Sequence, residues 1–448
     1  MFSRILVANR GEIALRIIRT CKQLGIETVG IYSEADEDSL HVRFADESIR
    51  IGPSESTKSY LNISSIISTA EIADVDAIHP GYGFLSENPH FAEVCRSCKI
   101  EFIGPSESAM ELLGNKVNAK ETARMTGVPV IPGSKGLVED EDEAIKVASD
   151  IGYPVIIKAV HGGGGRGMRV SHNEASLKSG MYAARREAEN AFKNGELYIE
   201  KYIESPRHIE IQVIADMHGS FIHLGERDCT IQRRNQKLLE ESPSPALSSE
   251  TREAMGNAAI TLMKKAGYFN AGTVEFLYDA QSEEYFFMEV NARLQVEHPV
   301  TEMITGLDLV EEQIRIASGE KLRHTQENIT FEGAAIECRI NAENPDNNFI
   351  PNPGRIDFFV PPMLNDVRLD THCYGGYSIP SHYDSLIGKL ITKGKDRADA
   401  INKARIALDL FLIEGIPTTI PFHKKLLKNA RFASGQYDIH FVEEEFFN

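Results

Sequence analysis

Two carboxylates in adjacent predicted strands carry the clearest chemical signal in this chain. Residues 273–278 and 285–291 are typical of β-strands, and the polar residues between them predict a hairpin. With its turn centred on Ser282, this hairpin places Glu275 opposite Glu289, at a Cβ separation of about 4.5–5.5 Å. Two carboxylates this close repel each other unless a cation lies between them or one of them is protonated.

Side-chain alternation beyond the second strand extends its polar face. Every second residue onward from Glu289 is polar and the residues between are apolar, so a continued strand would gather the polar set on one side. This set is Glu289, Asn291, Arg293, Gln295 and Glu297. A solvent-exposed strand is the alternative, but the set contains no lysine, serine or threonine.

The chemistry that this face offers is phosphoryl or acyl transfer with a metal ion. Glu275, Glu289 and Asn291 supply oxygen ligands, which Mg²⁺ or Mn²⁺ takes, usually together with substrate phosphates. Arg293 offers a planar fork for an oxyanion. Glu297, further along the face, is a candidate general base.

A glycine run at residues 162–167 predicts a flap that covers phosphates. Its string, GGGGRG, formally matches GxGxxG, but residues 168–171 are typical of a strand where a dinucleotide-binding motif needs a helix. A strand–glycine–strand hairpin remains, and its backbone N–H groups can approach a phosphate closely. Lys158 would bring a cation to the same phosphates. A flexible hairpin tip without a ligand is the alternative.

Other catalytic and structural motifs are missing from the sequence. There is no GxxxxGK[ST] string, so a P-loop is excluded, and neither HExxH nor GxSxG occurs. Six cysteines are too few for a disulfide framework. The single CxxC, Cys95 and Cys98, has no second pair to complete a zinc site, and we interpret both as ordinary thiols at a helix end.

The elements that must position these residues fall into regions of different pattern. Residues 1–113 alternate strand and helix signals, which predicts a parallel sheet of βαβ units. The turn at residues 9–12 follows the first strand, at the edge where such sheets bind ligands, but it lacks GxGxxG and so disfavours a nicotinamide cofactor. The expected strands are residues 4–8, 27–32, 75–79 and 101–103, with a helix over residues 11–24.

The remaining chain predicts three further regions. Residues 114–134 are expected to form a helix and a turn that link domains, because two prolines and a glycine end the segment. Residues 135–203 read as a small βα unit that carries the glycine flap. Residues 204–448 read as a larger α+β region, so the expected fold class is α/β and α+β.

Composition limits the partners. The 448 residues suggest about three domains, and 42% hydrophobic with 25% charged residues is ordinary for a globular protein. The net charge of −18 disfavours nucleic acid. No apolar run approaches the roughly 18 residues of a membrane span. The N-terminal residues lack the features of a signal peptide, so we expect no membrane partner and a cytoplasmic location.

With these residues in place, the chain resembles the ATP-grasp enzymes and, within them, biotin carboxylase. The resemblance runs nearly end to end. It rests on long strings: NRGEIA from residue 9, HPGYGFLSEN from residue 79, residues 163–168, RDC from residue 227 with QRR from residue 232, and residues 289–299. It implies an ATP-grasp fold with an N-terminal Rossmann-like domain, a small mobile lid and a larger C-terminal domain with an antiparallel sheet.

The resemblance also implies a reaction, that of an ATP-dependent ligase. ATP phosphorylates bicarbonate to carboxyphosphate, which decomposes to CO₂, and the N1′ atom of biotin captures the CO₂. Glu297 would deprotonate bicarbonate, and Arg339 would stabilise the biotin enolate, with Tyr82 near the biotin ring. Lys237, Arg293, Gln295, the backbone of Val296 and Glu297 would hold bicarbonate.

The nucleotide and metal contacts implied by the resemblance form a larger set. The metal, Mg²⁺ or Mn²⁺, would bind Glu275, Glu289 and Asn291. Contacts to ATP phosphates would come from Lys116, Lys158, His208 and the flap residues Gly163, Gly164, Gly165, Arg166 and Gly167. Adenine and ribose would lie among Glu200, Lys201, Ile203, Gln232 and Leu277, and Asn235 stands where some relatives carry a histidine near the nucleotide.

Several of these residues have a structural alternative. Lys116 and Lys201 are also consistent with solvated surface charges. His208 is equally consistent with a half-buried strand histidine. Arg339 shares a strand face with Glu337, so a structural salt bridge between them is an alternative to a catalytic role.

The sequence also bears on partners and rival functions. It has no Ala-Met-Lys-Met string and no carboxyltransferase region, so we expect biotin on a separate biotin carboxyl carrier protein, with carboxyltransferase subunits as partners, most simply in acetyl-CoA carboxylase. Rivals are the corresponding subunit of a propionyl-CoA, methylcrotonyl-CoA or pyruvate carboxylase, a carboxylate–amine ligase, and a non-catalytic nucleotide-binding scaffold. Family members commonly form homodimers, and Arg16 with Arg19 either faces a partner or forms an ordinary basic helix face.

Overall fold

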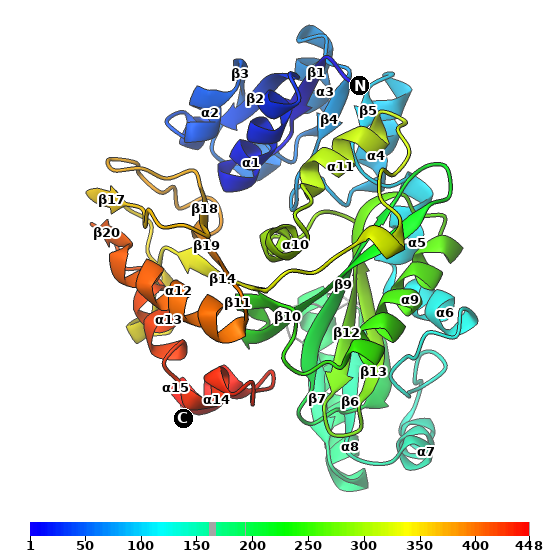
Figure 1. Cartoon of the computed structure of the whole chain (residues 1–448). Coiled ribbons are helices and arrows are strands. Elements are labelled where there is room, and N and C mark those ends of the chain that lie inside the picture. The colour runs from blue at the N-terminus through cyan, green and yellow to red at the C-terminus, as the bar shows by residue number, and fades with distance from the viewer. Residues whose placement is uncertain (161–166, 193, 448) are drawn as a thin grey trace.

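The N-terminal region forms a parallel sheet, as predicted (Figure 1). The computed structural model describes residues 1–160, 167–192 and 194–447. The sheet order is β3-β2-β1-β4-β5, and every neighbouring pair is parallel. Its strands are β1 (Arg4–Val7), β2 (Glu27–Ser33), β3 (Glu47–Gly52), β4 (Ala77–His79) and β5 (Glu101–Phe102). Its helices are α1 (Gly11–Gln23), α2 (Leu40–Phe44), α3 (Ile63–Ile72) and α4 (Pro89–Ser97).

The edge strand β3 was not predicted. Of its six residues only Ile51 is buried, so the sequence there has neither a clear alternation nor an apolar run. Cys95 and Cys98 lie at the end of α4, as expected, and both are free thiols.

The segment after the first sheet is packed against the rest of the protein. It contains α5 (Glu107–Gly114) and α6 (Lys116–Met125), whose N-terminus is capped by Asn115. The helix expected here is confirmed. The following turn binds a distant strand, since the N–H of Phe287 donates to the carbonyl of Pro129 at 2.8 Å and Val130 bridges Phe287.

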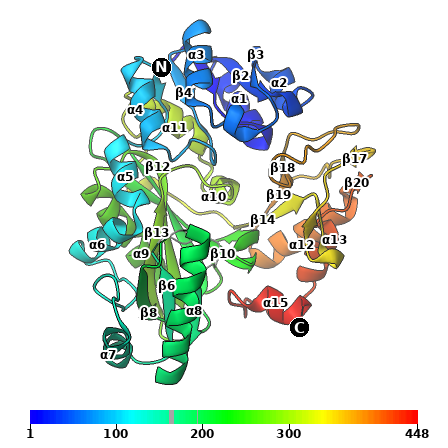
Figure 2. The same ribbon diagram turned by 180° about the vertical axis from the view of Figure 1, so that it is seen from behind.

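The strands on either side of the predicted glycine run belong to a small three-stranded unit with order β7-β6-β8 (Figures 1 and 2). Its elements are β6 (Val155–Ala159), β7 (Met168–Ser171), β8 (Leu197–Lys201), α7 (Glu141–Ile151) and α8 (Glu174–Phe192). β6 and β7 are antiparallel, with Lys158 opposite Met168, so the strands of the predicted hairpin are confirmed. Gly163, Gly164, Gly165 and Arg166 lie outside the described residues, whereas Gly167 is described.

A single eight-stranded sheet forms the centre of the molecule. Its order is β13-β12-β9-β10-β11-β14-β19-β18. The strands are β9 (Arg207–Ala215), β10 (Phe221–Arg233), β11 (Gln236–Ser242), β12 (Asn270–Asp279), β13 (Glu284–Asn291), β14 (Ala334–Asn341), β18 (Val367–Thr371) and β19 (Leu386–Gly394). Three helices accompany it: α9 (Ser249–Lys265), α10 (His298–Thr305) and α11 (Leu309–Ala317). All neighbouring strands are antiparallel, and the sheet brings side chains from distant segments of the chain onto one surface.

The C-terminal part packs on the β14–β19 side of this sheet (Figure 1). Its core includes Ile336, Leu390, Ala404 and Phe432. The helices are α12 (Arg397–Leu410), α13 (Ile420–Leu426), α14 (Ala430–Ala433) and α15 (Phe441–Phe446). Two short ladders pair β15 (Glu343–Asn344) with β16 (Ile350–Pro351) and β17 (Phe358–Val360) with β20 (Leu412–Glu414).

The predicted carboxylate pair is confirmed, but its hairpin differs near the turn. Glu275 is opposite Glu289 in the β12–β13 ladder. Closer to the turn the register is shifted by one, with Phe276 opposite Phe287, so Met288 is the extra residue of a bulge. β13 also ends at Asn291. The strand predicted to continue towards residue 297 is therefore wrong, and an irregular segment leads instead into α10.

The first helix is tied to the central region by an internal ion-pair network. Arg16 is 4% exposed and contacts Glu302 and Asp308, each at 2.8 Å. Arg16 is thus not part of an ordinary basic helix face. Arg19 is half exposed and contacts Asp370 at 3.3 Å. None of the described helices combines the length and the apolar character that crossing a bilayer requires.

Gly167 closes the hairpin of the three-stranded unit, and its backbone predicts a test. Its φ is +73°, and a Cβ added there would lie 2.8 Å from the Cβ of Ala159. We expect Gly167→Ala to destabilise this unit by about 1–2 kcal/mol from backbone strain alone, and to raise the KM of any nucleotide bound beneath it.

Gly25→Ala is the matched control for this variant. Gly25 has a similar φ of +71°, but an added Cβ would meet nothing within 4 Å. It should show a comparable strain cost in thermal unfolding with no change in nucleotide KM. Equal KM values for both variants and the wild-type protein would contradict the inference.

Candidate active site

One large cavity collects most of the predicted site residues. It has a volume of about 930 Å³ and lies between the three-stranded unit and the central sheet. Its walls include predicted residues from every region after the first sheet: Lys116, Lys158, Lys201, Ile203, His208, Gln232, Asn235, Lys237, Glu275, Leu277, Glu289, Asn291, Arg293, Gln295, Val296, Glu297 and Arg339. Lys116 and Arg339, which are 223 positions apart in the sequence, thus face one space.

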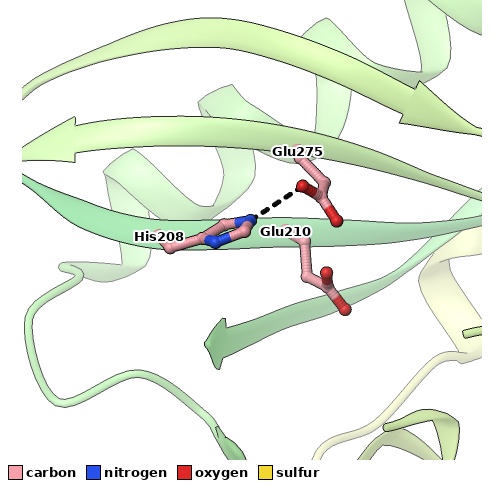
Figure 3. Close-up of side chains that lie close together, drawn as sticks. All are labelled: His208, Glu210 and Glu275. Carbon is pink, nitrogen blue, oxygen red and sulfur yellow. Dashed lines mark hydrogen bonds and ion pairs between the residues drawn. The ribbon is translucent and has the colours of Figure 1, made fainter. Parts of the chain in front are cut away.

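The oxygen cluster lies at the end of the β12–β13 hairpin. Glu275 Oε1 accepts a hydrogen bond from Asn291 Nδ2 at 2.9 Å, and Glu275 Oε2 lies 2.8 Å from His208 Nε2 (Figure 3). Glu289 is 3.3 Å from the ammonium group of Lys116. Two carboxylates and an amide on adjacent strands form a donor set of the kind that a hard divalent cation prefers.

His208 is not the half-buried strand histidine of the alternative interpretation. It is only 8% exposed, and its ring pairs with Glu275. Burial lowers the pKa of His208, but the Glu275 carboxylate outweighs burial and the net pKa is raised. Glu210 lies close to both residues, with one ligand atom from each of the three within 4.8 Å of the others (Figure 3).

Lys237 is a buried cation shared by three carboxylates. Its Nζ lies 2.7 Å from Glu210, 3.2 Å from Glu275 and 2.6 Å from Glu297. Burial opposes its charge, yet Cys229 and these three carboxylates raise the pKa of Lys237 well above its ordinary value. Lys237 therefore stays charged in the site.

Glu297, the predicted base, is held ionised before any substrate binds. It caps α10 and is 1% exposed. Its Oε1 faces Lys237, and its Oε2 accepts from Arg339 at 2.9 Å. Burial raises the pKa of Glu297, but Lys237, Arg339 and Arg227 outweigh burial and hold the pKa well below its usual range. A carboxylate so placed can accept a proton once a substrate displaces one of its cations.

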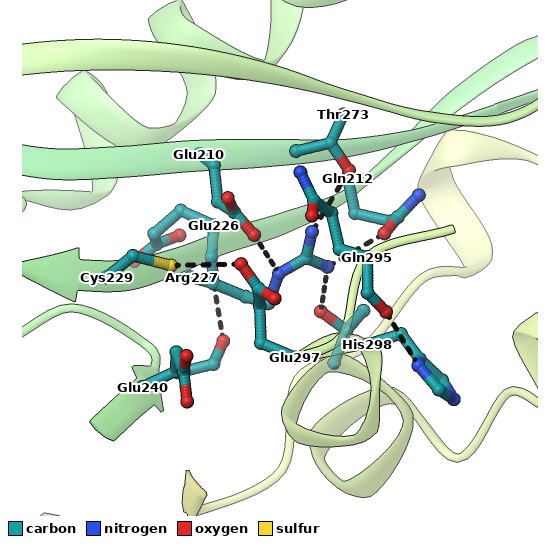
Figure 4. Close-up of polar contacts among 12 residues, drawn as sticks. Glu210, Gln212, Glu226, Arg227, Cys229, Glu240, Thr273, Gln295, Glu297 and His298 are labelled. Atoms are coloured by element: carbon teal, nitrogen blue, oxygen red, sulfur yellow. Dashed lines mark hydrogen bonds and ion pairs between the residues drawn. The ribbon is translucent and has the colours of Figure 1, made fainter. Parts of the chain in front are cut away.

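Arg227 lies beside this base (Figure 4) and lowers its pKa. Its side chain is fully buried and donates to Glu210 at 2.5 Å and to Gln212 at 2.8 Å. It also donates to Thr301 of α10 and Thr273 of β12. Three segments, β9, β12 and α10, thus meet on the guanidinium group of this β10 residue. Sequence reasoning assigned it no role, although it stands in the RDC string.

Arg293 is oriented by three neighbours. Its nitrogens donate to Glu87 at 2.7 Å, Gln295 at 2.8 Å and Asn291 at 2.9 Å. Glu87 also accepts from the N–H of Ala292 at 2.9 Å. Sequence reasoning did not assign Glu87, and its position within the HPGYGFLSEN string was the available signal.

Lys158 lines the cavity and forms an ion pair with the buried Glu200. Glu200 is 3% exposed, contacts Lys120, and lies 2.7 Å from Lys158 Nζ. Its carboxylate does not line the cavity. Two lysines bind the Glu200 carboxylate, and the placement of Glu200 beside adenine and ribose stays a prediction.

Lys201 and Lys116 differ in exposure. Lys201 Nζ donates to the carbonyls of Gly152 and Tyr153 at 3.1 and 2.9 Å, so it is not a solvated surface charge. Lys116 is 56% exposed, as in the alternative interpretation, but it lines the cavity beside Glu289.

Arg339 and Tyr82 lie on different cavities. Arg339 lies 2.6 Å from Glu240 and 2.9 Å from Glu297, so the alternative salt bridge to Glu337 is wrong. Tyr82 lines a second cavity of about 330 Å³ beside Arg10, and its hydroxyl donates to Glu12.

Lys389 connects the two cavities. It lies 5.9 Å from the Tyr82 ring, contacts Glu12 at 3.1 Å and donates to the carbonyl of Val296 at 2.9 Å.

Comparisons with known proteins agree along the whole chain. The family described as "Biotin carboxylase, N-terminal domain" matches residues 1–110, "Carbamoyl-phosphate synthase L chain, ATP binding domain" matches 115–325, and "Biotin carboxylase C-terminal domain" matches 337–444. "Biotin carboxylase 1" of Bacillus subtilis is 58% identical over 99% of this chain and 98% of its own. A pyruvate carboxylase subunit of Methanothermobacter thermautotrophicus is 53% identical over 99% and 90%.

Solved structures give the same picture. The "Biotin Carboxylase-beta-gamma-ATP Complex" from Campylobacter jejuni superposes with a TM-score of 0.94 at 50% identity, and the match covers 99% of both chains. The biotin carboxylase domain dimer of the Hydrogenobacter thermophilus 2-oxoglutarate carboxylase, with magnesium ADP and bicarbonate, gives 0.92 at 48% identity, covering 99% of this chain and 98% of that one.

The central position of Arg227 predicts a large loss of stability on its removal. Arg227→Met leaves Glu210 buried without its closest cation, and such a loss costs about 3–5 kcal/mol in the free energy of unfolding. Chemical denaturation would measure it.

Arg252→Met is the matched control. Arg252 also pairs with a buried carboxylate, since two of its nitrogens donate to Glu226, but Arg252 is 22% exposed and its loss should be clearly smaller. Equal losses for the two variants would show that the buried position of Arg227 adds nothing to its contribution to stability.

Proposed function

The chain belongs to the biotin carboxylase family, and we propose that its main cavity carboxylates biotin with bicarbonate at the expense of ATP. One observation carries the proposal. Glu297 is held ionised between Lys237 and Arg339 in the same cavity as the oxygen cluster of Glu275 and Glu289. The candidate base Glu297 and the candidate metal ligands Glu275 and Glu289 therefore line the same cavity.

We assign the nucleotide side of the cavity to ATP. Lys116, Lys158 and His208 would contact the phosphates together with the flap, including Gly167. Lys201, Ile203, Gln232, Asn235 and Leu277 line the cavity where adenine and ribose would lie.

Glu275, Glu289 and Asn291 would hold Mg²⁺ or Mn²⁺, and their oxygen donors fit either ion. When bound, this ion neutralises phosphate charge and makes the γ-phosphoryl group easier to attack.

The bicarbonate side supplies a base and a set of fixed cations. Lys237, Arg293, Gln295 and the backbone at Val296 would hold the anion, and Glu297 would remove its remaining proton. The deprotonated oxygen then attacks the γ-phosphorus, the bond to the β–γ bridging oxygen breaks, and ADP leaves carboxyphosphate behind. Cations that are already in place need no reorganisation as charge develops.

Carboxylation of biotin completes the sequence. Carboxyphosphate breaks into CO₂ and phosphate, the phosphate takes the proton from N1′ of biotin, and N1′ attacks CO₂. Arg339 would stabilise the negative oxygen of the biotin enolate, with Tyr82 beside the ring. Because carboxyphosphate hydrolyses readily, closure of the three-stranded unit over the cavity would protect it from water.

We propose the same division of the chain that the sequence predicted. Residues 1–113 form the Rossmann-like domain, 114–134 a connecting segment, 135–203 the lid, and 204–448 the ATP-grasp core with the C-terminal domain. The separate five-stranded, three-stranded and eight-stranded sheets support this division.

The partners follow from the reaction. Biotin arrives on a carrier, and we propose a separate biotin carboxyl carrier protein and carboxyltransferase subunits, as in acetyl-CoA carboxylase. The Methanothermobacter relative, named as part of a pyruvate carboxylase, favours a second candidate in which pyruvate is the final acceptor. A cytoplasmic location stays a prediction.

We also propose a homodimer, by analogy with the Hydrogenobacter domain dimer. The β17–β20 ladder supports it, since Val360 and Leu412 are opposite each other and 50% and 44% exposed, with Phe358 at 59%. Arg19 is half exposed and could join the same contact.

The base assignment predicts the effect of Glu297→Gln. Biotin-stimulated, bicarbonate-dependent ADP release should fall by about 10²–10⁴-fold, because general-base catalysis contributes that much. Glu332→Gln, a change at a 77% exposed carboxylate, should leave the rate unchanged. Full activity in the Glu297 variant, or ADP release that responds to an amine rather than biotin, would favour the carboxylate–amine ligase.

The metal assignment predicts a different signature for Glu289→Gln. The Mg²⁺ concentration for half-maximal ATP turnover should rise by about tenfold or more, because a ligand is lost. Thermal stability should stay close to that of the wild-type protein, since Glu289 is 36% exposed. An unchanged magnesium dependence would remove Glu289 from the metal site.

A further inference from the structure

Two buried carboxyls lie side by side behind the catalytic arginine. Glu240 of β11 and Glu337 of β14 are direct partners in the antiparallel ladder, and both are fully buried. Directly opposite residues have Cβ atoms about 4.5–5.5 Å apart. The proposed mechanism uses neither residue, and the sequence pattern indicated for Glu337 only an alternative salt bridge to Arg339.

The hydrogen bonds of this pair are incomplete in a specific way. Glu240 Oε1 accepts from Arg339 Nε at 2.6 Å, whereas Glu240 Oε2 has no hydrogen-bond partner among the described residues. Neither carboxylate oxygen of Glu337 has a hydrogen-bond partner among the described residues. Glu241, the next residue on β11, contrasts with both, because Arg397 donates to its two oxygens at 2.5 and 3.0 Å.

The nearby cations are already bound by other groups. Lys389 contacts Glu12 at 3.1 Å and the carbonyl of Val296 at 2.9 Å. Arg339 is shared by Glu240 and Glu297, and Lys237 is surrounded by three other carboxylates. An ionised Glu337 would be a buried charge with no bound counterion, which costs far more than taking up a proton.

Titratable groups face the pair from each element packed around it. β14 contributes Cys338 and Arg339, β19 contributes Lys389, β11 contributes Lys237, β10 contributes Cys229, and the start of α10 contributes Glu297. Further along α10, Val300 and Ile304 pack on Ala335 and Ile391 and keep that side apolar. Burial depresses the pKa of His298 well below its ordinary value, so this ring brings no charge.

We propose that Glu240 and Glu337 hold one proton between them, and that Glu240, through Arg339, positions the guanidinium group against Glu297. The second part rests on the proposed function of Glu297. Burial raises the pKa of Glu337 well above its ordinary value, and burial also raises that of Glu240 to about 7, in agreement with one shared proton near neutral pH.

The pair acts as a positioning device because Arg339 has two carboxylate neighbours. With Glu240 ionised, Arg339 is held between Glu240 and Glu297. If the pair took up a second proton, so that Glu240 was also neutral, Arg339 would form an ion pair with Glu297 alone. The tighter pair would make Glu297 a weaker base, so the rate should fall on the acid side.

The shared proton is tested by the pH dependence of stability. Glu337 binds a proton in the folded state and releases it on unfolding above its ordinary pKa, so folded protein loses stability as the pH rises beyond that value. One proton changes the unfolding equilibrium constant by tenfold per pH unit. Glu337→Gln should therefore reduce the pH slope by up to that amount relative to the wild-type protein, and should be no less stable at pH 8.

Glu241→Gln is the matched control on the same strand. It should destabilise the protein at all these pH values, because it breaks an ionised pair with Arg397. Infrared spectra at neutral pH should show a protonated-carboxyl band in the wild-type protein and in this control, but a weaker band in Glu337→Gln. A Glu337 variant with an unchanged pH slope and an unchanged band would overturn the shared proton.

The positioning role is tested by the pH profile of kcat/KM for bicarbonate. The wild-type rate should rise with pH through about 7, the pKa of Glu240. Glu240→Gln should remove this acid limb and lower kcat/KM at pH 8 by about tenfold or more, with the KM for ATP unchanged. Retention of the limb in the variant would overturn the role of Glu240. Wild-type protein without biotin-stimulated turnover would refute the proposed function instead, and the stability and infrared measurements would still decide the shared proton.

Discussion

The site depends on the burial of one cation, Lys237, among carboxylates that come from separate segments. Glu210 lies on β9, Glu275 on β12 and Glu297 at the start of α10, and all three are within 3.2 Å of its ammonium group. None of these charges is stable alone in a dry interior, and Arg227 and Arg339 add two further cations that offset the carboxylates. The strands and the helix must therefore meet at this point, and the cavity forms where they do.

This arrangement joins two kinds of chemistry through a single residue. Glu275 Oε2 pairs with His208 on the proposed nucleotide side, and Glu275 Oε1 accepts from Asn291, Lys237 and Gln295, of which the last two are proposed bicarbonate contacts. The nucleotide and the bicarbonate thus share a charge network. In the proposed mechanism, Glu297 removes the proton of bicarbonate next to the phosphoryl group that the resulting nucleophile attacks.

The sequence predicted the pairing within the β12–β13 hairpin, but it did not predict the contacts between distant segments. Alternation placed Glu275 opposite Glu289 correctly, although the turn is one residue off, because the bulge at Met288 restores the register. The polar run to Glu297 was grouped correctly, yet it leaves the sheet after Asn291. Arg227 and Glu87 received no role, because their partners lie 15 to 206 positions away and only the packed fold brings them together.

The central claim is that bicarbonate, activated by Glu297, attacks the γ-phosphoryl group of ATP directly. Turnover in bicarbonate labelled with heavy oxygen, followed by mass spectrometry of the released phosphate, tests this step most directly. The account predicts one heavy oxygen in each phosphate, because the bridging oxygen of carboxyphosphate comes from bicarbonate and stays on phosphorus. Phosphate without label during biotin-dependent turnover would contradict it.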